Sequence, residues 1–125
     1  MELLLHARLT GTGTNTDGAY LPIKGRYEVK SAQVVDLAGV AANGSNYAEI
    51  KVLGNDQSTA LFQWSTKTGE EGALTQYAQA ELADQEATEK AILNDEPLVV
   101  QLAKAGTGVN VDCYVCVRLV KARSY

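Results

Sequence analysis

One segment near the C-terminus alternates between two classes of residue over twelve positions, from 109 to 120. Its even positions are mostly polar: Asn110, Asp112, Tyr114, Cys116, Arg118 and Val120. Its odd positions are all apolar: Val109, Val111, Cys113, Val115, Val117 and Leu119. A period of two is typical of a strand that has one dry face and one wet face. The segment therefore predicts a half-buried strand and favours an all-β fold.

Shorter stretches of the same alternation recur along the chain, in residues 2–9, 19–23, 27–37 and 98–102, and in a hairpin over 46–66. Lys24-Gly25 predicts a hairpin turn between the second and third stretches. The polar middle of 27–37 suggests a sheet edge or a bulge. About eight short strands without a long helix predict a single antiparallel β-sandwich over residues 1–125, of jelly-roll-like topology. Within it, residues 1–18 form a strand followed by a flexible arm or loop.

Residues 75–93 are ambiguous between a helix and a strand. The segment is rich in Ala, Glu, Gln and Lys, which favour a helix. Yet Ala78, Ala80 and Leu82 alternate with polar side chains, as in a strand. We favour a strand that ends at Leu82, followed by an acidic connection with one helical turn. Pro97 then opens the next strand.

Composition excludes several classes of partner. The 125-residue chain carries a net charge of −4, and its 11 Lys and Arg residues are scattered. Because phosphate recognition needs clustered basic residues, we expect neither nucleic-acid nor membrane binding. The segment MELLLHARL is too short in apolar residues and too charged for a signal peptide. No stretch approaches the ~20 apolar residues of a membrane-spanning helix. We therefore expect a soluble protein that is made in a cytoplasm.

No pattern in the sequence predicts catalysis, a cofactor or a metal. Cys113 and Cys116 form a C-x-x-C string, but their odd separation within a strand points them to opposite faces. We expect Cys113 to be buried and Cys116 to be half-exposed, and His6 to lie on a polar strand face. Residues 14–18 lack the acidic residues of a calcium loop. The sequence therefore predicts a protein that is not an enzyme and holds no cofactor.

Contacts with another protein are the remaining class of function. Tyrosine is favoured where one side of a residue is packed and the other is wet. Phe62 and Trp64 share an apolar face and are expected in the core. Asn15 and Asp17 lie in a polar loop that could order on contact. The candidate contact residues are therefore Tyr47, Tyr77, Tyr114, Tyr125, Asn15 and Asp17.

Three stretches carry a resemblance to a known class of protein. They are LTGTGTNTDGAYLPIKGRYEV (9–29), SNYAEIKVLGNDQSTALFQWSTKTGEEGAL (45–74) and ILNDEPLVVQLAKAGTGVNVDCYVCVRLV (92–120). Together they resemble the capsid decoration (cement) and head-fibre proteins of tailed bacteriophages. The acidic, Ala-rich segment YAQAELADQEATEKA departs from that pattern.

The resemblance implies a virion protein on the outer surface of a capsid. Its partner would be the major capsid protein, whose neighbouring subunits it would bridge, often as a homotrimer. Binding would add interfaces that exist only in the expanded shell and would stabilise that state by mass action. The alternative function is a glycan-binding β-sandwich module of a phage fibre or surface protein. A glycan array would discriminate between the two.

Overall fold

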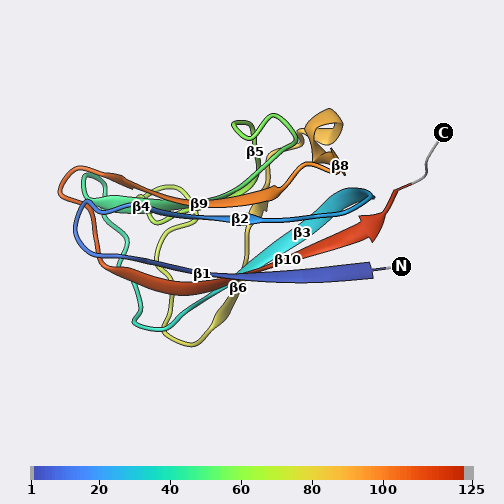
Figure 1. The fold of residues 1–125 in the computed structure, drawn as a ribbon. Coiled ribbons are helices and arrows are strands. Elements are labelled where there is room, and N and C mark those ends of the chain that lie inside the picture. The colour runs from blue at the N-terminus through green and yellow to red at the C-terminus, as the bar shows by residue number, and fades with distance from the viewer. Residues whose placement is uncertain (1, 123–125) are drawn as a thin grey trace.

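The structure is a computed structural model that describes residues 2–122. Within this range, two antiparallel β-sheets pack face to face (Figure 1). The elements are β1 (Glu2–Gly11), β2 (Asp17–Leu21), β3 (Arg26–Asp36), β4 (Tyr47–Leu53), β5 (Ala60–Ser65), β6 (Gln79–Glu81), β7 (Ala83–Asp84), the 3₁₀ helix η1 (Thr88–Ala91), β8 (Ile92–Asn94), β9 (Leu98–Ala105) and β10 (Val111–Lys121). No helix in this range is long and apolar enough to cross a membrane.

The strand order is that of a jelly roll. Sheet A has the order β1-β10-β3-β6, with β8 also paired to β3, and sheet B has the order β2-β9-β4-β5-β7. If β6, β7 and β8 are counted as one interrupted strand, sheet A reads 1-8-3-6 and sheet B reads 2-7-4-5, with the β7 piece of strand 6 added at the edge beside strand 5. These orders are those of an eight-stranded jelly roll built from two Greek keys. The predicted antiparallel, jelly-roll-like β-sandwich is confirmed, and the sixth of its eight strands is divided into three pieces.

The divided strand is the ambiguous segment 75–93. β6 pairs with β3 in sheet A, β7 pairs with β5 in sheet B, and β8 returns to β3. The predicted strand that ends at Leu82 corresponds to β6, which begins only at Gln79, and the chain forms a further strand, β7, after Leu82. The predicted helical turn agrees with η1. Two open sheet edges, at β3 and β5, need hydrogen-bond partners. Pairing to those edges outweighs the helix propensity of the segment.

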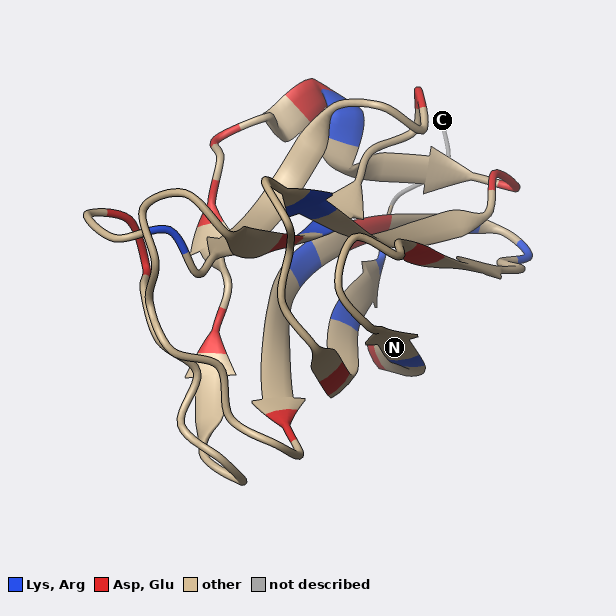
Figure 2. Ribbon diagram, turned by 90° about the vertical axis from the view of Figure 1, so that its left-hand side faces the viewer, with Lys and Arg blue, Asp and Glu red and all other residues tan. Residues whose placement is uncertain are grey.

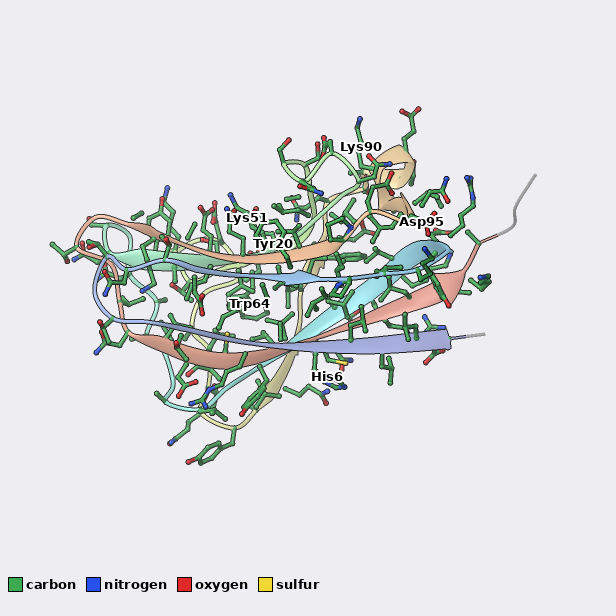
Figure 3. All side chains as sticks on the ribbon, viewed as in Figure 1. His6, Tyr20, Lys51, Trp64, Lys90 and Asp95 are labelled. Carbon is green, nitrogen blue, oxygen red and sulfur yellow. The ribbon has the colours of Figure 1, made fainter. Side chains whose placement is uncertain are left out.

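The core lies between the sheets and follows the alternation of β10. Its odd residues from Val111 to Leu119 are at most 3% exposed, and Cys113 is among them. Across the core, sheet B contributes fully buried Ile50, Val52 and Leu102. Trp64 also points between the sheets (Figure 3), and its Nε1 donates a 3.0 Å hydrogen bond to the Gly72 carbonyl. The prediction that the odd positions of β10 face the core is therefore confirmed for residues 111–119.

The predicted hairpin over 46–66 is confirmed, because β4 and β5 pair directly. The hairpin turn predicted at Lys24-Gly25 is wrong. Gly25 does turn the chain with a φ of +105°. However, β2 belongs to sheet B and β3 to sheet A, so the turn carries the chain across the sandwich. Local turn chemistry marks a change of direction, and it does not say which sheet receives the next strand.

β3 contains the predicted bulge but is not a sheet edge, because it lies between β10 and the pair β6 and β8. Its register with β10 shifts between Arg118 and Leu119, which leaves Lys30 unpaired with β10. A one-residue bulge reverses which side chains face the core. Val29 is therefore buried before the bulge, whereas Val34 is buried after it and Val35 is only half-buried. The alternation expected to bury Val35 fails for this reason.

Two neighbouring residues of β9 test the core. Leu102 is fully buried, and the adjacent Gln101 is exposed on the other face. We expect Leu102→Ala to lower the free energy of unfolding by about 2–5 kcal/mol, because it removes buried methyl groups and leaves a cavity. Gln101→Ala should change it by less than about 0.5 kcal/mol. Urea unfolding followed by tryptophan fluorescence measures both, and equal losses would contradict the assignment of faces.

Candidate protein interaction site

Four connections meet at one end of the sandwich, at the left of Figure 1 and facing the viewer in Figure 2. They are residues 12–16, 37–46, 66–78 and 106–110, which link β1 to β2, β3 to β4, β5 to β6 and β9 to β10. We call this surface the loop end. The jelly-roll order brings these loops together although they are far apart in the sequence.

Hydrogen bonds join each loop to a neighbouring one. Asn110 Oδ1 accepts from the Gly13 amide at 3.0 Å, and Asn46 Oδ1 accepts from the Thr107 amide at 2.8 Å. The carbonyl of Asn43 accepts from the Thr68 amide at 3.3 Å. Asparagine suits these positions because its short amide side chain satisfies backbone groups that have no ladder partner. The loop end is therefore a connected surface.

The Lys104 side chain links two of the loops by hydrogen bonds. Its Nζ donates to the carbonyl of Gly13 at 3.0 Å and to that of Val109 at 2.6 Å. The side chain is partly buried between them, and this burial lowers the pKa of Lys104. An ammonium on two carbonyls links loop 12–16 to loop 106–110 by charge-assisted hydrogen bonds.

Glycine permits the closest approach between these loops. Gly108 has a φ of +70°, and a Cβ there would overlap the Gly13 carbonyl. Gly106 has a φ of +64°, and a Cβ there would overlap the Ser45 carbonyl. The A-G-T-G segment thus needs glycine both for its left-handed backbone and for the contact with neighbouring loops.

The loop end is largely uncharged. Loops 12–16, 37–46 and 106–110 contain no charged residue, and loop 66–78 contains Lys67, Glu70 and Glu71. In Figure 2 the loops nearest the viewer are mostly tan. Two hollows lie beside Asn110, of about 740 Å³ next to Asn15 and about 410 Å³ next to Asn43. Such a surface suits contacts by shape and hydrogen bonding more than recognition of a charged group.

The structure places five of the six candidate contact residues, and Tyr125 lies outside the described residues. Asn15 lines the larger hollow, and Tyr77 lies in loop 66–78. Asp17 and Tyr47 are the first residues of β2 and β4, at the same end of the sandwich. Tyr114 lies on the outer face of sheet A and is 43% exposed. The five described candidate residues, which are far apart in the sequence, thus lie at or near the loop end, but they do not form one patch.

Tyr77 has the most unusual environment of these residues. Its side chain is 70% exposed, and its backbone has a φ of +62°. A bulky residue in the left-handed region is strained, at a cost of the order of 1–3 kcal/mol. Its amide donates a 2.8 Å hydrogen bond to the carbonyl of Asp36, which holds the loop in place. A strained backbone that presents an exposed aromatic ring is a reason to suspect a contact site.

Two of the other candidate tyrosines, Tyr114 and Tyr47, have cations over their rings. The Arg8 guanidinium lies 5.7 Å from the Tyr114 ring centroid, and Lys67 Nζ lies 5.5 Å from that of Tyr47. Arg8 also binds both carboxylate oxygens of Asp112, at 3.0 and 2.9 Å, and this hydrogen bonding lowers the pKa of Asp112. These contacts restrict the rings before any partner arrives.

Two exposed apolar residues were missed by the sequence analysis. Tyr20 on β2 is 69% exposed, and Leu4 on β1 is 52% exposed. The alternation in the sequence could have predicted their exposure, because each alternates with apolar neighbours that point into the core. Both belong to the edge strands at the side of the sandwich.

The prediction for the cysteines is confirmed. Cys113 is fully buried and Cys116 is half-buried on the opposite face. Cys116 lies beside His6 on the outer face of sheet A (Figure 3), with 4.0 Å between Sγ and Nε2. Across residues 2–122, no three His, Cys, Asp or Glu side chains form a group that could hold a metal ion.

No protein-family model matches this sequence, and no curated protein sequence is detectably similar to it. Among solved structures, the fold is weakly similar to the structure of infectious bursal disease virus Gx strain, with 9% identity and a TM-score of 0.40. That similarity covers 99% of this chain, which spans 33% of the other. Desmodium yellow mottle tymovirus gives 6% identity and a TM-score of 0.39, covering 99% of this chain and 91% of the other.

Gly108 tests how tightly the loops interlock. Gly108→Ala should lower the free energy of unfolding by more than about 2 kcal/mol, because the new Cβ overlaps a neighbouring loop and the backbone is left-handed. Gly72→Ala is the matched control, since Gly72 has a φ of +89° with nothing within 4 Å of the added Cβ. It should show the backbone cost alone, about 1 kcal/mol. Equal losses in thermal unfolding would contradict the close approach of the loops.

The two thiols test the faces of β10. Burial raises the pKa of Cys113 to about 12 and also raises the pKa of Cys116. We expect one thiol, Cys116, to react slowly with Ellman's reagent in the native protein, because only a thiolate attacks. Cys113 should react only in denaturant. Cys116→Ser is the control and should abolish the native reaction. A native reaction that survives this substitution would place Cys113 at the surface.

Proposed function

We propose that this protein is a structural component of a virion, a decoration (cement) protein that binds the outer face of a capsid through its loop end. The observation that carries the proposal is the interlocked, mostly uncharged loop end, which presents the strained and exposed Tyr77. Its partner would be the major capsid protein. The sequence resemblance to phage decoration proteins supports the same role.

The fold is compatible with this role and does not decide it. Jelly rolls serve in viral capsids, in lectins and in cupin enzymes, so the topology alone fits several functions. The residues at the surface of the loop end favour one of these functions over the others. The hollows of the loop end are lined by Thr, Gly, Ala, Val and Asn, with Asp112 as their charged residue. The uncharged groups bind by complementarity of shape, and the carboxylate of Asp112 is already held by two hydrogen bonds from Arg8.

A rigid loop end would bind with little loss of conformational entropy. Loops tied by Lys104, Asn46 and Asn110 are already ordered before contact. Exposed tyrosines supply large contact area with few rotatable bonds. If the matching surface on the capsid forms only in the expanded shell, binding stabilises that shell by mass action. Repetition over the shell then multiplies a modest affinity.

Co-sedimentation with capsid shells tests the proposal. The purified protein is mixed with expanded and with unexpanded capsid shells of the virus that the proposal assigns it to, and bound protein is measured in the pellet. We expect saturable binding to expanded shells alone. Bound shells should also survive heating that disrupts bare ones. Binding to neither kind of shell would refute the role.

Two equally exposed tyrosines locate the contact. Tyr77 at the loop end is 70% exposed, and Tyr20 on β2 is 69% exposed. We expect Tyr77→Ser to weaken shell binding at least about tenfold, which is the effect of losing a contact of about 1.4 kcal/mol. Tyr20→Ser should leave binding unchanged. Similar losses for both variants would mean that the loop end is not the contact surface.

A glycan array with the isolated protein separates the alternative function. A decoration protein should give no signal on the array. Selective glycan binding that Tyr77→Ser abolishes would instead assign the loop end to a sugar.

A further inference from the structure

Within residues 2–122, no strand pairs with the outer edge of β1. Strand β1 is the first strand of sheet A and pairs with β10 along its whole length. At its far end, the Thr10 amide donates a 2.9 Å hydrogen bond to Asp17 Oδ2 on β2, away from β10. Asp112 lies opposite Thr10, and its carbonyl accepts from the Leu37 amide at 2.8 Å, also away from the β1–β10 pair. Thr10 and Asp112 are therefore a non-hydrogen-bonded pair of the ladder.

This pair fixes the direction of every backbone group in β1. Successive residues of a strand direct their N–H and C=O groups to opposite edges. Leu4, His6 and Arg8 therefore point their backbone groups to the same outer side as Thr10, as does Glu2. Asp17 already occupies the Thr10 amide. The open stretch of the edge runs over residues 2–8 and lies at the front of the lower sheet in Figure 1.

The side chains along this stretch are incompletely covered. Leu3 and Leu5 face the core but are only partly buried, whereas Leu9 further along the strand is fully buried. Leu4 on the opposite face is 52% exposed. Natural proteins protect exposed edges with proline, inward-pointing charge or a covering segment. Residues 2–8 contain no proline, and Leu3, Leu5 and Ala7 supply no inward charge. The stretch is open to another strand.

We propose that a second copy of this chain occupies the edge, by antiparallel pairing of the two β1 strands about a two-fold axis at Leu5. Leu5 is the centre of the open stretch, so only this register uses all of it. The register places the outward-pointing backbone groups of Leu4 opposite those of His6 of the second copy, as a ladder requires. Leu5 then meets Leu5 of the second copy in a non-hydrogen-bonded pair, and both become buried.

Charge supports a second copy as the occupant. The same register places Glu2 opposite Arg8 of the second copy. Within one chain, Glu2 already accepts a 2.9 Å hydrogen bond from Arg118, and Arg8 binds Asp112. Pairing would therefore place four side chains of alternating charge in one row across the interface. Arg118 and Glu2 of one copy would be followed by Arg8 and Asp112 of the other. The two-fold axis repeats this row, as an isologous interface demands. The two five-stranded sheets A would then join into one continuous sheet.

Disulfide trapping in a Cys116→Ser background tests the register. A non-hydrogen-bonded antiparallel pair has its Cα atoms about 4.5 Å apart, within the range of a disulfide. Leu5→Cys should therefore form a covalent dimer under mild oxidation. Leu3→Cys is the matched control on the same face, since its two copies would lie about 14 Å apart along the strands. It should stay monomeric. Equal cross-linking of the two variants, or none of Leu5→Cys, would overturn the proposal.

Sedimentation velocity on the unmodified chain provides the second measurement. We expect a reversible dimer between about 10 µM and about 1 mM, because a short interface associates weakly. His6→Pro removes an outward amide and no bond to β10, so it should abolish the dimer with an unchanged circular dichroism spectrum. His6→Thr keeps the amide and should keep the dimer. A monomer at every concentration, or an oligomer that survives His6→Pro, overturns the proposal. If His6→Pro does not fold, the cross-linking pair decides.

Discussion

Strand β10 is the element on which the rest of the structure depends. It pairs with β1 on one side and with β3 on the other, so it joins the two ends of the chain in one sheet. Its odd residues form the central layer of the core against sheet B. Because a strand presents its side chains alternately, this one requirement also turns Cys116 and Tyr114 to the outer face. The sheet cannot form without β10, and the loops cannot meet without the sheet.

The alternation is also why so much of the fold could be predicted. The β4–β5 hairpin, the core face of β10 and the burial of Cys113 all follow from local periodicity. Sheet membership does not, because β2 and β3 are adjacent in sequence but lie in different sheets. The bulge opposite Arg118 and Leu119 shows the second limit. Its presence could be inferred from the polar middle of β3, but a shift of one residue decides whether Val34 or Val35 is buried.

Individual residues of the candidate site could be predicted from the sequence, but their positions relative to one another could not. Tyrosines at strand ends and a polar loop at Asn15 could be selected from the sequence. Their convergence depends on the strand order, which brings connections from both halves of the chain to one end. Lys104 shows the same limit, because it resembles any strand lysine until the loops of Gly13 and Val109 close around it. Tyr20 is the opposite case, since the alternation of 19–23 already points it outward.

The loop end and the β1 edge differ in how their backbone groups are satisfied. At the loop end, asparagine side chains and Lys104 form hydrogen bonds with the backbone amides and carbonyls that have no partner in the β-ladder. The other side chains of these loops remain for recognition of a partner. At the β1 edge, the ladder formed by residues 2–122 is unfinished, and the Asp17 side chain occupies the Thr10 amide. A partner at the loop end would meet a preformed surface, whereas a partner at the edge would complete a sheet. Because β1 runs along the side of the sandwich, the two proposed contacts use different surfaces. An edge-paired dimer would therefore present two loop ends, and each weak contact would raise the effective concentration of the other.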